Sequence, residues 1–315
     1  MIFIFGLMIG SFLNVVIYRL PADESIVWPG SRCPKCQHAL AWWENLPVLS
    51  WLMLKGRCFG CKTPISWRYP AIELATAGLF LLIYFQFGLT WQSGFLWVLA
   101  SLLTVVFWID LDTMTIFDAV TVPGVVLGLI YSAVITQQFW YALAGALMGV
   151  AVLLLIDNLT LLAIKQHGIG DGDLILIAML GAWLGLTQLG LALGLAFVSG
   201  AVLGLAVMFF QWLKQRCWQP FAIAAAVAVP LFIGTAWLFG SVTDGGAAAI
   251  GPGMLAIFAG FSAMVGASAG LFFMRLTRDE DYVYMPFGPS LVLGGLGSLF
   301  WGVPLAEAYF GRGLF

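Results

Sequence analysis

Two aspartates stand where long apolar stretches of the chain meet polar ones. Asp110 is near the end of one apolar stretch, and Asp173 follows the glycine-rich run 168–172 just before another. Ionisable groups next to hydrocarbon are costly, so such a pair is by default a sign of function. Two carboxylates can act as general base and general acid, and glycines allow the backbone of another chain to come close. Acid–base chemistry at a membrane surface is one interpretation, and a helix cap at Asp173 is the other.

Four cysteines form a second group with a spacing that suits chemistry. They make two C-x-x-C pairs, Cys33 with Cys36 and Cys58 with Cys61, with 21 residues between the pairs. Thiolates at this spacing can share one zinc ion in a ribbon-like fold. Two disulfides or four unbridged thiols are the alternatives.

The segment 21–70, which carries these cysteines, is surrounded by and contains many basic residues. Segments rich in basic residues next to membrane spans are usually cytoplasmic. The basic residues in or beside this segment are Arg19, Arg32, Lys35, Lys55, Arg57, Lys62 and Arg68. Because the cytoplasm is reducing, disulfides are disfavoured there. The sequence therefore predicts a structural zinc site in a cytoplasmic loop.

Composition sets the class of protein that must position these residues. The chain has 315 residues, of which 62% are hydrophobic and 9% charged, and its mean hydropathy is +1.01. These values are typical of a polytopic membrane protein. The net charge of -2 and the lack of a long basic run argue against nucleic acid as a partner. The first twenty residues lack the pattern of a cleavable signal, so we expect a retained span there.

The predicted fold class is an all-α polytopic membrane protein with about eight to ten transmembrane helices and a small cytoplasmic zinc-ribbon-like loop domain. Gly6 and Gly10 in the first span favour helix packing over lipid contact. Threading the spans alternately from a cytoplasmic segment 21–70 brings Asp110 and Asp173 to the cytoplasmic face. Hydropathy places the spans near 1–20, 71–89, 92–111, 118–136, 138–164, 174–188, 189–213, 220–240, 250–275 and 289–309.

This pattern predicts three parts. Residues 1–20 form a first transmembrane helix, 21–70 form the cysteine loop domain, and 71–315 form a transmembrane domain with an extra helical hairpin near 220–273. The tryptophans of the loop domain are expected at the lipid headgroup level.

Three further polar residues are candidates for a site. Asp157 lies inside an apolar span, where pairing with a polar neighbour is the favoured interpretation. His38 and His167 have no partner at a metal-binding spacing, so a histidine metal site is not expected and His38 is placed at the ribbon surface.

Taken together, these motifs resemble the type IV prepilin peptidases, membrane aspartic proteases of the GxGD type. The resemblance covers most of 10–190 and returns at 285–300. The matching stretches are GSFLNVVIYRLP at 10–21, the two C-x-x-C pairs, NLPVLSW at 45–51, RYP at 68–70 with Glu73, Asp110 with Asp118, GDGD at 170–173, LGAWLG at 180–185 and PFGP at 286–289.

The resemblance implies which residues carry the activity. The family's catalytic aspartates fall on Asp110 and Asp173, and its zinc-binding cysteines fall on Cys33, Cys36, Cys58 and Cys61. Gly170, Gly172, Asp118, Arg68 and Glu73 match family motifs and are expected to support the site. Asp112 is a poorer candidate than Asp110, because two residues along a helix turn the side chain by about 200°. Asp171 could be displaced from Asp173 in the same way.

Three features depart from the family pattern. Ile175 stands where the family usually has Lys, and Phe117 stands where Pro is common. The third departure is the added hairpin near 220–273. The first two lie in the site region, and the hairpin could bind a partner or alter the substrate range.

The resemblance also implies a function. The expected reaction is removal of the basic leader peptide from type IV prepilins or pseudopilins, by an enzyme of the bacterial inner membrane whose active site faces the cytoplasm. Pilus assembly and type II secretion use such substrates. Methylation of the new amino terminus with S-adenosylmethionine is expected by resemblance alone, since no glycine-rich fingerprint for that cofactor occurs; the metal loop is its expected place.

Two other classes remain open at this stage. A proton- or cation-coupled transporter would use paired aspartates near the bilayer midplane, in broken helices. A membrane scaffold with a zinc ribbon and no chemistry would use the aspartates as helix caps, and it would tolerate Asn at both positions.

Overall fold

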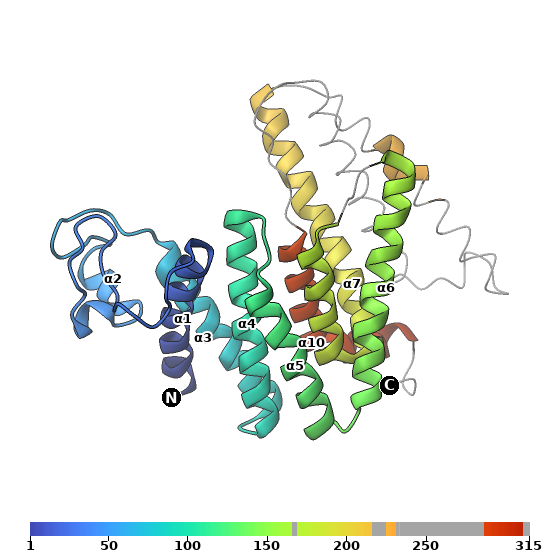
Figure 1. The fold of residues 1–315 in the computed structure, drawn as a ribbon, viewed down its shortest axis with the longest axis horizontal. Helices are drawn as coiled ribbons and strands as arrows, with labels where there is room; N and C mark the ends of the chain where they lie inside the picture. The colour runs from blue at the N-terminus through green and yellow to red at the C-terminus, as the bar shows by residue number, and fades with distance from the viewer. Residues whose placement is uncertain (166–168, 216–224, 231–232, 234–286, 311–315) are drawn as a thin grey trace. The chain divides into compact units, whose positions relative to one another are not determined.

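The computed structural model describes residues 1–165, 169–215, 225–230, 233 and 287–310, and it divides into two compact units (Figure 1). The first unit is Met1–Gln137 and the second is Gln138–Phe315. The described residues contain helices and two isolated β-bridges, without a strand. The predicted all-α class is therefore confirmed for this part of the chain.

The first unit holds four long helices and the cysteine loop. The loop lies between the first two long helices and carries short helical turns at Leu20–Ala22, Trp42–Asn45 and Leu49–Met53, the last being α2. The long helices are α1 (Ile2–Arg19), α3 (Arg68–Phe87), α4 (Trp91–Thr113) and α5 (Asp118–Val134).

Two glycines allow α1 and α3 to pack with their backbones in contact. A Cβ atom at Gly6 would lie 2.6 Å from the Cα of Ala77, and one at Gly10 would lie 2.7 Å from the Cα of Glu73. Small residues that permit close approach are the usual basis of helix association in membranes. The expected packing role of Gly6 and Gly10 is confirmed, and it fixes Glu73 against α1.

Aromatic packing and a helix cap hold α4 against α3. The Trp97 ring stacks on Phe80 with 5.4 Å between ring centroids, and its indole N–H donates to the Phe80 carbonyl oxygen at 3.1 Å. At the start of α4, the Thr90 hydroxyl oxygen accepts from the Ser93 N–H and satisfies a free donor of the first turn. These contacts set the position of α4, whose last turn carries Asp110.

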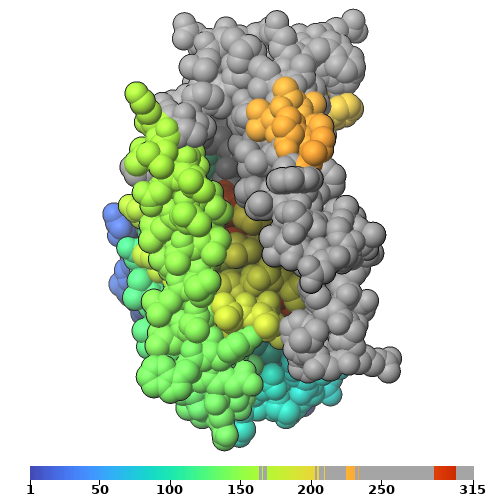
Figure 2. Space-filling view, turned by 90° about the vertical axis from the view of Figure 1, so that its right-hand side faces the viewer, coloured from blue at the N-terminus to red at the C-terminus, as the bar shows by residue number. Residues whose placement is uncertain are grey.

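The second unit is built on α6 (Phe139–Ile164), α7 (Asp171–Gln215) and α10 (Gly288–Phe310). Figure 2 shows α6, in green, covering one side of α7, in yellow. Gly181 makes this contact possible, because a Cβ there would lie 2.5 Å from the carbonyl carbon of Gly145. On α10, the Ser298 hydroxyl donates to the Gln188 carbonyl oxygen of α7 at 2.7 Å.

The two spans expected at 174–188 and 189–213 correspond to two helical segments that together make up α7. Its regular geometry is interrupted at Gly185, where φ is 72° and ψ is 178°. The Tyr141 hydroxyl bonds the side chain and the backbone N–H of Thr187 just beyond this break, at 2.8 and 3.0 Å. The hydropathy pattern placed the boundary between the two spans three residues too late. Apolar residues continue on both sides of the break, and only Gly185 marks it.

A helix lies at each of the spans predicted within the described residues. Five described helices are long and apolar enough to cross a membrane, namely α1, α3, α4, α6 and the first part of α7, while α5 is shorter. The spans expected at 220–240 and 250–275, and the hairpin near 220–273, lie outside the described residues except for a short helical run at 225–230.

Candidate functional site

The cysteine loop consists of two knuckles with the same backbone pattern. In the first, the Cys33 N–H donates to the His38 carbonyl oxygen at 2.9 Å, and an isolated bridge joins Arg32 to Ala39. The second repeats both features with Cys58 and Thr63, and with Arg57 and Pro64. Each knuckle turns through a residue with positive φ, Gln37 at 59° and Lys62 at 58°. Gly60, in the second knuckle, does not supply this turn.

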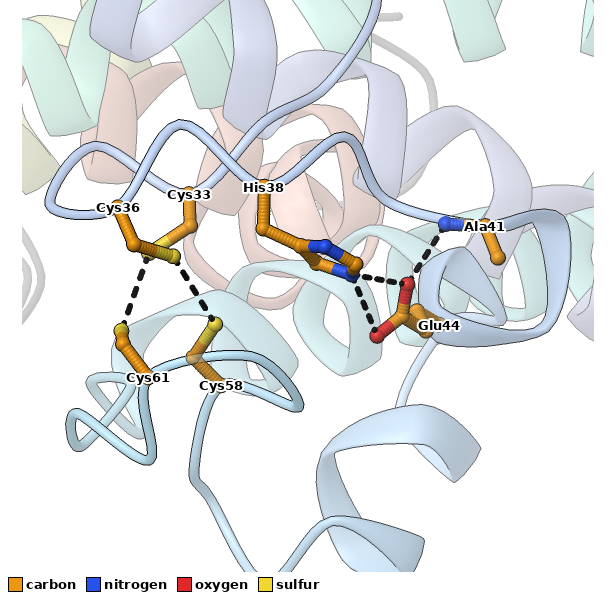
Figure 3. Close-up of polar contacts among 7 residues, drawn as sticks. All are labelled: Cys33, Cys36, His38, Ala41, Glu44, Cys58 and Cys61. Carbon is orange, nitrogen blue, oxygen red and sulfur yellow. Dashed lines mark hydrogen bonds and ion pairs between the residues drawn. The ribbon is translucent and has the colours of Figure 1, made fainter.

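The two knuckles bring the four cysteine sulfurs together (Figure 3). All four Sγ atoms lie within 4.8 Å of one another, with 3.8 Å between Cys33 and Cys61 and 4.0 Å between Cys36 and Cys58. Zn–S bonds of about 2.3 Å in a tetrahedron put sulfurs about 3.8 Å apart, whereas a disulfide bond needs about 2.05 Å. The four thiols therefore suit one metal ion and form no disulfide.

The electrostatics of the knuckles favour thiolate at Cys61. Hydrogen bonds with Thr63, from its hydroxyl and its backbone, lower the pKa of the Cys61 thiol to about 6. The pKa of Cys33 is lowered chiefly by the backbone N–H of Cys36, against the opposing effect of burial. Thiolate is the form that binds metal.

A carboxylate that no sequence motif indicated lies beside the first knuckle. The Glu44 side chain is 3% exposed, accepts from the Ala41 N–H at 2.7 Å and lies 3.0 Å from His38 Nε2 (Figure 3). The Ala41 bond, followed by His38, holds the pKa of Glu44 below its usual range. His38 was expected at the ribbon surface, without a second metal ligand at a suitable spacing; its side chain is 36% exposed and pairs with Glu44. Neither spacing nor composition signalled this pair.

Asp110 lies in the last turn of α4. Its side chain is 4% exposed, and its carbonyl oxygen accepts from the Met114 N–H that ends the helix, at 2.9 Å. Asp112, two residues on, is exposed and forms an ion pair with Arg68, with 2.6 Å between Oδ2 and Nη2. Asp112 therefore points to a different neighbour, as the helical geometry predicted.

The other residues of the first unit that were expected to support the site, Arg68, Glu73 and Asp118, lie apart from one another and make different contacts. Arg68 ties the start of α3 to the end of α4 through Asp112. Glu73 is 7% exposed and faces the cysteine loop, where it accepts from the Val48 N–H at 2.7 Å. Asp118 is exposed in the first turn of α5, directly after Phe117.

The glycine-rich loop leads into α7, which begins at Asp171. The Asp173 N–H donates to the Gly170 carbonyl oxygen at 3.1 Å, so Asp173 lies in the first turn of the helix. Gly168 lies outside the described residues. Asp110 belongs to the first unit and Asp173 to the second, so their pairing stays a prediction.

Asp157 of α6 contacts this loop. Its Oδ1 atom accepts from the backbone N–H of Ile169 at 3.2 Å, and its side chain is half-buried. The expected pairing of Asp157 with a polar neighbour is confirmed. Its partner is the segment that leads to Asp173.

Comparison with known families and proteins gives a consistent result. The model of the bacterial peptidase A24 N-terminal domain matches residues 4–87, and that of the type IV leader peptidase family matches 97–205. Proteins named prepilin leader peptidase/N-methyltransferase match along the chain. The one from Myxococcus xanthus is 43% identical over 208 residues, which are 66% of this chain and 62% of that protein.

Other relatives of that name are covered more fully. The one from Stutzerimonas stutzeri is 37% identical over 249 residues, 71% of this chain and 86% of the relative. The one from Neisseria gonorrhoeae is 36% identical over 269 residues, 76% of this chain and 89% of the relative. No solved structure matches the chain.

Proposed function

Because this chain belongs to the type IV leader peptidase family, we propose that it is a membrane aspartic endopeptidase that removes the basic leader peptide from type IV prepilins or pseudopilins. We propose further that it methylates the amino terminus that cleavage exposes. The shared name of the relatives, prepilin leader peptidase/N-methyltransferase, supports both activities.

The proposed place of action is the cytoplasmic face of the bacterial inner membrane. Five apolar helices make the chain a multi-pass membrane protein. The basic residues around the cysteine loop support a cytoplasmic position for that loop. A substrate with an apolar helix and a basic leader suits such a site, since its helix can stay in the bilayer while the leader remains in the cytoplasm.

The observation that carries the peptidase proposal is the position of the two aspartates within their own helices. Asp110 is buried in the last turn of α4, and Asp173 lies in the first turn of α7 after a glycine-rich loop. A coupled transporter would be expected to hold such acids near the middle of the bilayer. The position of both aspartates at helix ends supports hydrolysis at a membrane surface instead of transport.

The two helix ends also suggest a division of roles. The first turn of a helix favours negative charge, and the last turn disfavours it. We therefore assign the ionised carboxylate to Asp173 and the proton to Asp110. Asp173 takes a proton from the attacking water, while Asp110 hydrogen-bonds the scissile carbonyl oxygen and later donates its proton toward the leaving amine. No covalent intermediate is needed.

The metal proposed for the four cysteines is zinc, in a structural role. The sulfur spacing fits a tetrahedral site that all four thiolates close, which leaves no open position for a substrate. Four neighbouring cations, Arg32, Lys35, Arg57 and Lys62, can offset the charge of the thiolates. The ion would join the two knuckles and so fix the shape of the loop.

Cleavage of a tagged prepilin-like substrate in membranes tests the peptidase. Asp110→Asn and Asp173→Asn are expected to abolish cleavage at normal protein abundance. Asp171→Asn is the matched control, because Asp171 is exposed and only two residues from Asp173; it should cut like the native chain. Normal cleavage by both site variants would disprove the assignment.

A further inference from the structure

The short helix α2 of the cysteine loop presents a group of exposed apolar side chains. Leu49, Leu52 and Met53 are 58%, 57% and 68% exposed. Their spacing of three and four residues puts them on one face of the helix. Trp51 turns instead into the cysteine loop, where its indole N–H donates to the Ile65 carbonyl oxygen at 3.1 Å. Large apolar side chains that are exposed together mark a contact surface.

The start of α2 is bonded to a residue inside a membrane span. Val48 directly precedes α2, and its N–H donates to the Glu73 carboxylate at 2.7 Å. Glu73 lies five residues after the first residue of α3, which places it about 7.5 Å along the helix. The 20 residues of α3 rise about 30 Å, which is the thickness of the hydrocarbon core, so α3 needs its whole length to cross. We therefore expect α2 to begin at or just below the edge of the hydrocarbon.

A fixed turn directs the chain from this bond into α2. Val48 has φ of 60° and ψ of -47°, and the Leu49 N–H donates back to the Pro47 carbonyl oxygen. A β-branched residue at positive φ is an outlier that surrounding contacts must maintain. Here the bond to Glu73 maintains it, so the structure sets the position of α2 relative to α3. Figure 1 shows α2 beside α1 and α3 and not beyond their ends.

The residues around α2 suit the boundary between lipid headgroups and acyl chains. Residues 46–54 contain no charged side chain, and two exposed cations, Lys55 and Arg57, follow them. Trp67, which directly precedes α3, is 70% exposed. Tryptophan is favoured at the headgroup level, and cations there are attracted by anionic lipids. An apolar helical face with such neighbours has the composition of an interfacial anchor.

We propose that α2 inserts into the membrane leaflet beside the cysteine loop, with Leu49, Leu52 and Met53 among the acyl chains. Lipid is the default neighbour of an exposed side chain at this depth, and the flanking cations and tryptophan suit its headgroups. The bilayer is therefore favoured over a second copy of the chain as the occupant of this face. Insertion of α2 holds the cysteine loop against the membrane, a role that goes beyond the proposed reaction and does not depend on it.

A photo-reactive amino acid in place of Leu52 tests the proposal in the full-length chain. The chain with p-benzoylphenylalanine at position 52 would be reconstituted in vesicles of phosphatidylethanolamine and phosphatidylglycerol, illuminated and analysed by mass spectrometry. We expect phospholipid adducts, attached along the acyl chain, in a yield similar to that from the same replacement of Leu82, which is 49% exposed in α3. Replacement of Lys35, an exposed residue of the first knuckle, is the control and should give only background.

The other outcomes overturn the proposal. Adducts limited to headgroups would place α2 on the membrane surface, and adducts to a second copy of the chain would make this face a protein interface. Background yield at Leu52 with normal yield at Leu82 would show that lipid does not cover α2, and equal yields at Leu52 and Lys35 would assign the contact to the whole loop. Elution of each variant as a single peak in detergent checks that it is folded. Because the readout is attachment to lipid and not cleavage, failure of the peptidase proposal would leave this test unchanged.

Discussion

Arg68 joins the start of α3 to the end of α4 through Asp112. Its Nη2 atom lies 2.6 Å from Asp112 Oδ2, and its guanidinium carbon lies 4.8 Å from the centre of the Trp108 ring. A planar guanidinium can make both contacts at once, which an ammonium cannot. The pair therefore orients the last turn of α4, in which Asp110 lies, from the opposite side of the helix.

Arg68→Lys is expected to slow prepilin cleavage several-fold while the chain remains inserted and abundant. The ion pair is partly exposed, so its loss should change stability by no more than about 1 kcal/mol. The double variant Arg68→Lys with Asp112→Asn should be no slower than the slower single variant, because both changes remove one contact. Fully additive losses in the cleavage rate would show that Arg68 acts independently of Asp112.

Asp157 should matter through its hydrogen bond to the Ile169 N–H. Asp157→Asn keeps an oxygen acceptor, whereas Asp157→Leu removes it and frees the loop that precedes Asp173. One hydrogen bond contributes about 1 kcal/mol, so we expect the Leu variant to lose about fivefold in kcat with little change in KM, and the Asn variant to stay near native. Equal losses in both variants would mean that charge, and not loop position, is the role of Asp157.

The metal site should be sensitive to acid in a way that Thr63 controls. The pKa of Cys61 is lowered to about 6 by its hydrogen bonds with Thr63. Above its lowered pKa the Cys61 side chain is a thiolate, which is the form that binds metal. As the pH falls through this pKa, the thiol takes up a proton and the gain in metal binding is lost. Bound zinc, measured by mass spectrometry after dialysis, is therefore expected to remain at pH 7 and to be released as the pH is lowered, because protons then compete with the ion for the thiolates.

Thr63→Val is the matched variant for this experiment, since it replaces the hydroxyl with a methyl group of similar size. Zinc should leave this variant at a higher pH than it leaves the native chain. An unchanged release profile would mean that Thr63 does not tune the site. Retention of zinc by Cys58→Ser at any pH would argue against the four-cysteine site.

The contact between α6 and α7 depends on the absence of a side chain at Gly181. A Cβ atom there would lie 2.5 Å from backbone atoms of α6, so Gly181→Ala must push the helices apart. Overpacking of this kind costs about 1–3 kcal/mol. Gly190→Ala, in the same helix but with open space around it, should be neutral or stabilising by about 0.5–1 kcal/mol. Thermal unfolding in micelles would compare the two variants, and equal destabilisation would contradict this packing.

Much of the fold and part of the site could be read from the sequence because the signals were local. Helical spans follow from hydropathy, the cysteine cluster from the C-x-x-C spacing, and the separation of Asp112 from Asp110 from the helical turn. Each depends on a few neighbouring residues. The break at Gly185 was placed three residues too late because apolar residues continue through it.

Contacts between distant segments could not be read in this way. The bond from Val48 to Glu73 joins residues 25 apart, and the ion pair from Arg68 to Asp112 joins residues 44 apart. Glu73 and Arg68 lie in motifs that the sequence shows. Their partners, however, depend on how α1, α3 and α4 pack. The pair of His38 and Glu44 is close in sequence, yet it forms only because the first knuckle turns the ring toward Glu44.

Asp110 and Asp173 are proposed to form one site, which requires their side chains to lie close together. Cysteines placed at both positions, in a chain with a protease site inserted at the boundary between the two units, would be treated with a short bifunctional thiol reagent and then cut. If the two aspartates share a site, the two halves will stay joined on a denaturing gel. A control pair at Asp112 and Asp171 should join far less. Halves that separate as readily for the 110/173 pair as for the control would contradict a shared catalytic site.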